Sequence, residues 1–507
     1  MDLTSRAGSL AALGEREFDL LVIGGGIIGA GIAAAATHQG LAVALVERDD
    51  FGGATSSSSS KLIHGGLRYL RLGDVRLVRE AHEERRHLMR VVAPHLVHQI
   101  PFLLPLYERG PYRPFVMQTG IALYSTLARA KLNGLVAPGR ASRMVPELRL
   151  DGLRKCGLYV DCWTNDSRLT LANVRAAAEA GGTVANYTEV SALRLDHGRV
   201  TGAEVVADGR TIVVRARSVV NASGPWLDTV RRLEDPAARA SIRLSKGIHV
   251  LVEPGSSWSA ALTIPHDKVR VSFAVPWQGM LLLGTTDALY QGDPAEVGVD
   301  EADIEQVLTE AARAVDPSLL GRDRVRAVFA GLRVLPGGAG STTSARRETV
   351  YTRGSGGMLS VAGGKLTTYR RIALDALEEL RPELGLDLLD RRPWPLPGAT
   401  GLDQLRLPVE VPAALRSHLR QLYGSLASEV LAPAVDDPSL LEPLSPGAPD
   451  IAAQALYAGT REWARSAEDV VRRRTTLSLR GCAGPDVMAR VDELLAPGRP
   501  PALAARG

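Results

Sequence analysis

The spacing of three glycines near the N-terminus favours a site for a dinucleotide. Gly24-x-Gly26-x-x-Gly29 is followed, 18 residues after its last glycine, by the carboxylate of Glu47. Glycines at these positions permit a tight turn, let the backbone approach a pyrophosphate and let a helix pack closely on a strand. A carboxylate about 20 residues further on accepts a hydrogen bond from a ribose hydroxyl. We therefore predict that these residues bind a dinucleotide.

A polar stretch soon afterwards holds groups that could act on a second ligand. The segment 54–69, ATSSSSSKLIHGGLRY, contains His64 and Arg68 and is too polar for a buried strand. Its hydroxyl and amide groups could line an extended cofactor. An unperturbed imidazole has a pKa of about 6.5 and can accept a proton near neutral pH, so His64 is a candidate base. A histidine that only packs against the cofactor is the alternative, and His249 is a rival base.

The elements around the glycine turn are those that a dinucleotide site requires. Residues 18–23 form an apolar run typical of a buried parallel strand, and residues 27–39 form a helix rich in Ile and Ala. Residues 42–46 form a second apolar strand that ends at Glu47. A glycine turn in an ordinary loop would lack this strand, helix and strand in register. The first amide groups of the helix would meet the phosphates.

Later segments alternate between expected strands and helices. Residues 190–216 are expected to form a β meander, because His197-Gly198 and Asp208-Gly209 are turn dipeptides between valine-rich runs. Residues 217–222 are expected to form a separate buried strand. The other expected elements are a hairpin at 269–283, a helix at 300–315, a strand at 358–362, a helical region at 400–495 and a loose leader at 1–17.

One short apolar segment has two interpretations. Residues 115–127, FVMQTGIALYSTL, lie among the basic residues Arg109, Arg113, Arg129 and Lys131. A segment of 13 residues is too short to cross a bilayer, which takes about 20. It is either a buried core helix or a helix that lies at a membrane interface.

The composition narrows the class of protein. The 507 residues suffice for two or three domains, and a formal net charge of +4 does not indicate a nucleic-acid partner. Cys156, Cys162 and Cys482 form neither a CxxC pair nor a spacing typical of a metal site. We therefore expect free thiols, no disulfide-reductase chemistry and no metal. We also expect neither export nor a bilayer-spanning segment.

Seven segments resemble the FAD-dependent glycerol-3-phosphate dehydrogenases, and the resemblance runs from about residue 18 to 490. The most specific are 54–70, ATSSSSSKLIHGGLRYL, and 363–370, GGKLTTYR. The others are DCWTNDSRL (161–169), NASGPW (221–226), LSKGIHV (244–250), LLGTTD (282–287) and AGLRVL (330–335). This family belongs to the glutathione-reductase-type FAD superfamily, which also contains D-amino-acid oxidase.

The resemblance implies an α/β fold with a glutathione-reductase-type, Rossmann-like FAD-binding domain, an inserted antiparallel β substrate domain and a C-terminal α-helical domain. We assign residues 16–80, 169–230 and 320–392 to the FAD-binding domain. Residues 81–168 and 231–319 are assigned to the substrate domain, and residues 398–497 to the C-terminal domain.

The implied activity is oxidation of sn-glycerol 3-phosphate to dihydroxyacetone phosphate, with the hydride passed to FAD. The chain has one convincing GxGxxG, whereas a flavoenzyme that exchanges electrons with NAD(P)H usually carries a second nucleotide unit. We therefore predict a quinone as electron acceptor and a cytoplasmic protein bound peripherally to the cytoplasmic face of the membrane. A homodimer stays open.

The resemblance and the residue types together assign roles to the site. His64 and Arg333 are expected at the alcohol, where Arg333 stabilises the developing alkoxide because a guanidinium cannot act as a base. Arg68, Tyr69 and Lys365 are expected to hold the substrate, principally its phosphate. The residues expected to bind FAD are Gly24, Gly26, Gly29, Glu47, Thr55, Ser56, Ser60, Lys61, Leu62, Gly224, Gly364, Leu366 and Thr367.

Three other functions stay open. The first is a glycerol-3-phosphate oxidase that passes the electrons to oxygen. The second is an FAD-dependent amine or 2-hydroxy-acid oxidoreductase, and the third is a non-enzymatic protein that uses the FAD fold to bind a partner. A spectrum of the purified protein and an assay with glycerol 3-phosphate, with and without a quinone analogue, would distinguish them.

Overall fold

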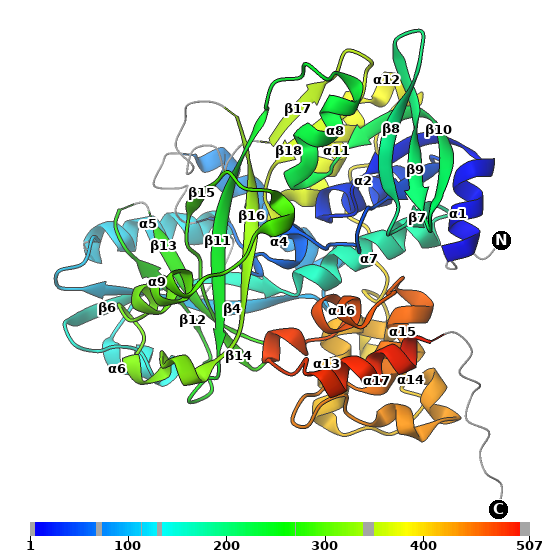
Figure 1. The fold of residues 1–507 in the computed structure, drawn as a ribbon. Coiled ribbons are helices and arrows are strands. Elements are labelled where there is room, and N and C mark those ends of the chain that lie inside the picture. The colour runs from blue at the N-terminus through cyan, green and yellow to red at the C-terminus, as the bar shows by residue number, and fades with distance from the viewer. Residues whose placement is uncertain are drawn as a thin grey trace, which may run out of the picture.

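Two large β-sheets and a group of C-terminal helices form the architecture of the chain (Figure 1). The computed structural model describes residues 6–66, 74–112, 114–128, 134–268, 270–337 and 349–496. This architecture confirms the predicted fold class.

The first sheet has the predicted nucleotide-binding unit at its centre. Its strands run in the order β17 (Thr349–Arg353), β18 (Leu359–Gly363), β10 (Arg210–Asn221), β1 (Glu17–Ile23), β2 (Val43–Val46) and β7 (Thr183–Ala185). Neighbours from β18 to β7 are parallel, and β17 pairs antiparallel to β18. Leu20, Leu21 and Val22 of β1 are fully buried. Since both faces of a parallel sheet are covered, the strand reads as a continuous apolar run.

Helices α2 (Ile27–His38), α7 (Asp166–Glu179) and α11 (Tyr369–Glu379) cover one face of this sheet. The alanine-rich α2 packs between the other two helices, and its small side chains let them approach closely. A Cβ atom on Gly31 would lie only 2.9 Å from the ring of Tyr369.

A β meander and an N-terminal helix cover the other face. Strands β8 (Glu189–Asp196) and β9 (Arg199–Ala207) pair antiparallel with the first half of β10, which confirms the meander. His197 and Asp208 both have positive φ angles, as the turn dipeptides predict. The expectation of a separate strand at 217–222 is wrong, because β10 runs without interruption from the meander into the parallel sheet.

The leader expected at residues 1–17 is a second correction. Residues 6–15 form helix α1 (Arg6–Glu15), and β1 begins at Glu17. The side chain of Leu13 is fully buried against Phe18 and Leu21. The described part of this segment therefore belongs to the core of the first sheet.

The second sheet is antiparallel except where β12 pairs with β4. Its strands run in the order β15 (Ala288–Tyr290), β11 (Ile242–Val252), β14 (Met280–Gly284), β13 (Val271–Trp277), β12 (Ala261–Pro265), β4 (Val97–Tyr107), β6 (Leu153–Thr164) and β3 (Leu62–Ile63). Two further strands pair beside this order: β16 (Val325–Pro336) pairs with β11, and β5 (Gly134–Val136) pairs with β6. The β13–β14 pair is the predicted hairpin. Strand β16 lies in the range 320–392 that we assign to the FAD-binding domain, yet it pairs along β11 of this sheet. The helices beside the sheets are α4 (Val75–His87), α5 (Pro114–Ala128), α6 (Pro138–Met144), α8 (Leu227–Glu234), α9 (Glu301–Ala311) and α12 (Arg381–Leu384).

Helix α5 combines features of both interpretations of residues 115–127. Ile121 and Tyr124 are buried against the second sheet, whereas the side chain of Phe115 is 80% exposed and that of Leu123 is 46% exposed. Among the described residues, no helix is both long and apolar enough to cross a membrane.

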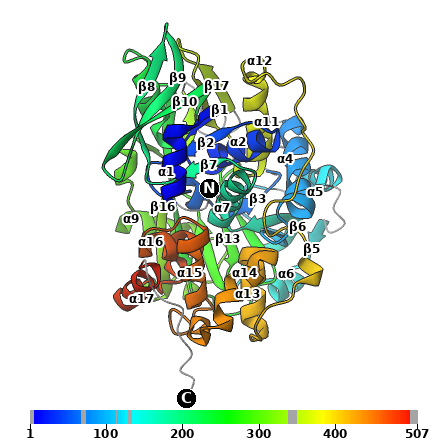
Figure 2. The same cartoon turned by 90° about the vertical axis from the view of Figure 1, so that its right-hand side faces the viewer.

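The C-terminal residues form a helical group with its own apolar core, as predicted. Its helices are α13 (Ala413–Tyr423), α14 (Ala427–Leu431), α15 (Ala452–Arg461), α16 (Ala467–Asp469) and α17 (Pro485–Leu495), and a π-helical turn, Val470–Arg474, follows α16. In both orientations these helices lie beside α7 and away from β17 and β18 (Figures 1 and 2).

Candidate active site

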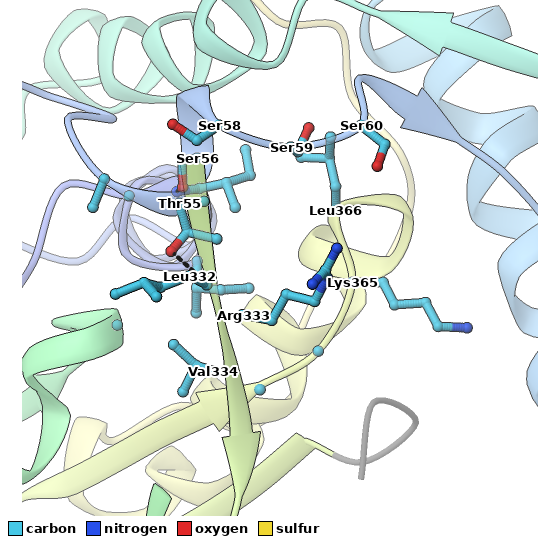
Figure 3. Close-up of a pocket in the computed structure, with 18 of the residues that line it drawn as sticks. Thr55, Ser56, Ser58, Ser59, Ser60, Leu332, Arg333, Val334, Lys365 and Leu366 are labelled. Carbon is cyan, nitrogen blue, oxygen red and sulfur yellow. Dashed lines mark hydrogen bonds between the residues drawn. The ribbon is translucent and has the colours of Figure 1, made fainter. Parts of the chain in front are cut away.

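A cavity of about 1800 Å³ lies where the two sheets meet. It is larger than the roughly 300–1,000 Å³ of a typical small-ligand pocket, so it has room for a dinucleotide and a substrate together. The predicted site residues that line it are His64, Arg333, Lys365, Gly24, Gly26, Glu47, Thr55, Ser56, Ser60, Leu62, Gly224, Gly364 and Leu366. Figure 3 shows Arg333 extending from β16 toward the turn that carries Lys365 and Leu366.

The glycine turn between β1 and α2 forms one wall of the cavity. Gly24 has a φ of +108°, and a Cβ atom there would lie 2.6 Å from the carbonyl oxygen of Ala222. Gly29 does not line the cavity. A Cβ atom on it would lie 1.9 Å from the carbonyl oxygen of Gly24, so Gly29 sets the packing of the helix on the turn. Gly26 faces the cavity beside the Ser56 hydroxyl.

Glu47 lies at the end of β2 and is fixed by backbone amides. One carboxylate oxygen accepts a hydrogen bond from the amide of Gly25 at 2.7 Å, and the other accepts one from the amide of Asp49 at 2.9 Å. Burial raises the pKa of Glu47, and these two hydrogen bonds oppose the rise. The carboxylate still faces the cavity, where a ribose hydroxyl could donate to it.

The polar turn at residues 54–60 forms a second wall, next to the glycine turn. Thr55 donates to the carbonyl oxygen of Leu332 at 2.7 Å and so joins this turn to β16 (Figure 3). The hydroxyl of Ser56 accepts from the amide of Ile27 at 2.8 Å and so joins it to the first turn of α2. The turn is therefore held by α2 on one side and by β16 on the other.

A network of polar side chains fixes Arg333 at the other end of the cavity. Its guanidinium donates to the Thr285 hydroxyl at 2.6 Å and to the carbonyl oxygen of Thr286 at 3.1 Å. The hydroxyl of Ser245 lies 3.4 Å from the guanidinium and donates to Asp287 at 2.5 Å. The Nη1 atom of Arg333 lies 4.0 Å from the Oδ1 atom of Asp287. A cation held by several partners is suited to meet a developing negative charge.

Three comparisons with known proteins agree with this geometry. Residues 19–370 match the family described as FAD dependent oxidoreductase, and residues 392–498 match the C-terminal domain of alpha-glycerophosphate oxidase. Glycerol-3-phosphate dehydrogenase 2 of Mycobacterium tuberculosis is 37% identical, over 97% of this chain and 86% of the relative. The chain belongs to the FAD-dependent glycerol-3-phosphate dehydrogenase family.

Two further relatives extend this result. D-erythritol 1-phosphate dehydrogenase of Brucella abortus is also 37% identical, over 90% of this chain and 94% of the relative. The crystal structure of glycerol-3-phosphate dehydrogenase from Bacillus halodurans, complexed with FAD, superposes with a TM-score of 0.76 at 27% identity and covers 97% of each chain. The chain is therefore an FAD-dependent oxidoreductase.

The walls of the cavity fit this cofactor. Gly24 and Gly26 line the cavity without a side chain of their own, and Glu47 stands at the distance along the chain that a ribose requires. The backbone at Gly224 and at Gly363 and Gly364 also lines the cavity without a side chain. These are the places where a large flat cofactor can approach the main chain.

Two of the residues predicted to bind the cofactor, Lys61 and Thr367, do not line the cavity. The Lys61 side chain is 1% exposed, and its ammonium pairs with Asp166 at 2.6 Å. The same carboxylate accepts from Ser59 at 2.7 Å, so Lys61 fixes the polar turn. Thr367 is also buried, and its hydroxyl accepts from the backbone amide of His64 at 3.0 Å. Both residues position the walls of the flavin site.

His249 is poorly placed to be the base. Its imidazole is buried and does not line the cavity, and its Nε2 atom lies 2.9 Å from the Ser60 hydroxyl. Burial, with the nearby charges of Arg333 and Lys61, holds the pKa of His249 well below its usual value. His64 lines the cavity, whereas Arg68 and Tyr69 lie outside the described residues.

The sequence prediction missed four residues that fix its candidate site residues, and three of them, Asp161, Thr285 and Asp287, also line the cavity. Ser245, Thr285 and Asp287 fix Arg333, and Asp161 accepts a hydrogen bond from the amide of Gly65, next to His64, at 3.1 Å. Burial raises the pKa of Asp161, and its pairing with Arg85 opposes the rise. All four lie in segments of the family resemblance, which is the signal that could have found them.

Proposed function

We propose that this chain oxidises sn-glycerol 3-phosphate to dihydroxyacetone phosphate. The observation that carries the proposal is that His64, Arg333 and Lys365 line one cavity together with the FAD-binding turn. The names of the 37%-identical relatives support this substrate class. FAD, when bound, supplies the hydride acceptor.

His64 is the proposed general base that takes the hydroxyl proton of the substrate. Its backbone is held by Thr367, which keeps the residue at the cavity wall. Arg333 cannot take a proton, and it stabilises the negative charge that develops on the alcohol oxygen. The Thr285 and Asp287 partners hold Arg333 in place, so little reorganisation is needed during the reaction.

Lys365 is the proposed phosphate ligand among the described residues, with Arg68 and Tyr69 as further candidates. A phosphate needs cationic donors, and Lys365 lines the cavity with its ammonium directed away from the guanidinium of Arg333 (Figure 3). Loss of one charged hydrogen bond to the phosphate costs about 1.5 to 3 kcal/mol, and it chiefly raises KM where ground and transition states share the contact.

Anaerobic stopped-flow reduction of the flavin tests the substrate. Rapid bleaching of the flavin band by sn-glycerol 3-phosphate is expected, and much slower bleaching by an amine or a 2-hydroxy acid. D-erythritol 1-phosphate is the second candidate substrate, because its dehydrogenase from Brucella abortus is equally identical to this chain. If D-erythritol 1-phosphate gives the higher ratio of reduction rate to apparent Kd, the substrate is the longer polyol phosphate and glycerol 3-phosphate is a poor analogue.

A quinone is the proposed electron acceptor. The chain has one GxGxxG unit, which FAD occupies, and therefore no second nucleotide unit that would favour NAD(P)H. The cavity extends to Tyr112, Met117 and the exposed side chains of Phe115 and Leu123, which make its mouth apolar. An apolar mouth suits an isoprenoid quinone better than it suits a charged dinucleotide. Turnover in air without quinone, at the rate seen with it, would favour the oxidase instead.

The same surface supports peripheral attachment to the cytoplasmic face of a membrane. Phe115 and Leu123 expose apolar area on α5, and Arg109 lies just before the helix. Each cation near an anionic surface adds about 1 kcal/mol of attraction, so binding should be weak and sensitive to salt. Sedimentation with anionic vesicles at low and high salt tests this part of the proposal separately from the substrate.

A further inference from the structure

A buried cluster of charges joins the C-terminal helices to the turn that follows β2. The carboxylate of Asp50, which is 2% exposed, accepts hydrogen bonds from both Arg473 and Arg474. One of these, from Nη2 of Arg474, measures 2.8 Å. Arg474 is fully buried and also donates to the carbonyl oxygen of Glu462 at 2.7 Å, while Arg473 pairs with Asp469 at 2.8 Å.

Asp50 belongs to the turn that places Glu47 in the cavity. The amide of Gly52 in this turn donates to the carbonyl oxygen of Gly25 in the glycine turn at 3.0 Å. The side chain of Asn186 donates to Asp50 at 3.2 Å, and the amide of Thr188 donates to the carbonyl oxygen of Glu47 at 2.7 Å. A shift of Asp50 would therefore move the residues that meet the ribose.

The C-terminal helices also supply part of the cavity wall. Arg472 and Arg473 line the cavity, as do Arg48 and Asp49 next to Glu47. The guanidinium of Arg48 lies over the ring of Trp226 at 3.9 Å. This end of the cavity is where the adenosine part of FAD would lie, because Glu47 meets its ribose.

A second buried ion pair from the same helices supports the polar turn at residues 54–60. Glu462 binds the guanidinium of Arg168 through both oxygens, at 2.6 and 2.7 Å. Arg168 lies in the first turn of α7, two residues after Asp166, the residue that holds Ser59 and Lys61. The C-terminal helices thus hold both walls of the cofactor site.

Buried ion pairs are an expensive way to attach one domain to another. Removing two charges from water has a large desolvation cost, so apolar contacts attach domains at least as well. Burial by itself raises the pKa of Asp50, but Arg474 and Arg473 outweigh it and hold that pKa below its usual value. The charged hydrogen bonds from Arg473 and Arg474 to Asp50 are directional, so they fix the position of the turn at residues 47–53, which carries Glu47.

We propose that the C-terminal helices are part of the FAD site: they fix the turn at residues 47–53 through Asp50, close its end of the cavity with Arg472 and Arg473, and so set how tightly the chain retains FAD. The matching family model describes these helices as a C-terminal domain, residues 392–498. The inference depends on FAD dependence alone and not on the substrate or the acceptor.

Titration of the full-length apoprotein with FAD, followed by flavin fluorescence, tests the proposal without substrate or acceptor. Asp50→Asn removes the charge at nearly unchanged shape, and we expect the Kd for FAD to rise about ten- to a hundredfold. The matched control is Glu429→Gln. Glu429 pairs with Arg175 of α7 at 3.0 Å and so joins the same helices to the same helix, but away from the cavity. Its Kd for FAD should stay within about twofold of the unsubstituted protein.

Arg472→Ala is the second variant, because Asp50→Asn leaves two buried arginines without their partner and can prevent folding. Arg472 is partly exposed, and its ion pair with Glu468 measures 3.5 Å, so its loss should leave the apoprotein Tm almost unchanged. We expect it to weaken FAD binding by about threefold or more. An unchanged Kd in Arg472→Ala, or a lowered Tm with an unchanged Kd in a folded Asp50→Asn protein, would overturn the proposal and leave the cluster as a domain attachment.

Discussion

The Nε2 atom of His249 lies 2.9 Å from the hydroxyl of Ser60, and of these two residues only Ser60 lines the cavity. The two candidate bases therefore occupy different positions. His64 lines the cavity, whereas His249 does not line it and contacts Ser60, a residue of the cavity wall. His249 is also stacked on Phe329, with ring centroids 4.8 Å apart. This arrangement favours a positioning role for His249, through its contact with Ser60.

The first prediction follows from this difference. His64→Ala should slow flavin reduction by glycerol 3-phosphate by about 10²- to 10⁴-fold, because the general base is lost. His249→Ala should slow it by less than about tenfold, because one hydrogen bond to Ser60 is lost. Stopped-flow reduction of both variants measures the two effects. A collapse of the rate in His249→Ala, with an unchanged rate in His64→Ala, would transfer the role of base to His249.

The pH dependence gives a readout that a structural defect would not move. A base must be deprotonated to work, so the rate falls as the pH falls through its pKa. The pKa of His249 is held well below its usual value by burial and by the charges of Arg333 and Lys61, so a fall in rate caused by protonation of His249 would come at a lower pH than one caused by an ordinary imidazole. The acidic limb should therefore disappear in His64→Ala and persist in His249→Ala.

The second prediction concerns the residues that hold Arg333. Asp287→Asn removes the charge 4.0 Å from the guanidinium and weakens the Ser245 contact, so Arg333 loses its fixed orientation. The rate of flavin reduction should fall about ten- to a hundredfold, with a smaller change in the Kd for substrate. A substrate Kd that rises while the limiting rate is unchanged would instead place Asp287 in substrate binding.

Asp303→Asn is the control for that experiment. Asp303 of α9 pairs at 2.6 Å with Lys246, which lies next to Ser245 in β11. Neither Asp303 nor Lys246 lines the cavity. Loss of this pair should lower the Tm slightly and leave the reduction rate unchanged. A similar loss of rate in both variants would mean that distortion of β11, and not the freedom of Arg333, explains the result.

The nucleotide-binding unit could be predicted from the sequence because its signals are local. All of them lie within about thirty residues of the chain. The apolar run in β1 indicates a strand buried on both faces, whereas the glycine turn and Glu47 indicate a close approach by a dinucleotide. The turns of the meander could also be predicted, because His197-Gly198 and Asp208-Gly209 are local signals, and His197 and Asp208 adopt the positive φ angles that such turn dipeptides favour.

The details that were missed depend on partners far away in the chain. Lys61 pairs with Asp166, 105 residues later, and no local pattern distinguishes that pair from a cofactor contact. Strand β16 is an ordinary apolar strand until β11 is known to lie beside it. Helix α1 is short and weakly patterned, and the burial of Leu13 depends on the sheet that it covers. Tertiary pairing decided all three.

The third prediction tests the close approach at the glycine turn. A Cβ atom on Gly26 would lie 3.1 Å from the Ser56 hydroxyl at the cavity wall, so Gly26→Val should place a branched side chain where the pyrophosphate passes. We expect the variant to be purified with little FAD, as measured by the ratio of absorbance at 450 and 280 nm. Gly139→Ala, in α6, has no atom within 4 Å of the added Cβ and should keep its FAD. A Gly26→Val protein with stoichiometric FAD would contradict the placement of the pyrophosphate.

The fourth prediction concerns the apolar mouth of the cavity on α5. Phe115 and Leu123 are exposed, so changing both to Ser should not disturb the core, and it removes the apolar area proposed to enter the membrane interface. Burial of a large apolar side chain contributes about 1.5 to 3 kcal/mol, so vesicle binding should weaken at least tenfold. Turnover in vesicles with a long-chain quinone should fall in parallel, while turnover with a water-soluble quinone analogue should not. Leu388→Ser is the matched control, because Leu388 is 86% exposed, does not belong to α5 and does not line the cavity. Equal vesicle binding by the double variant and the control would mean that α5 is a helix of the second sheet and not a membrane contact.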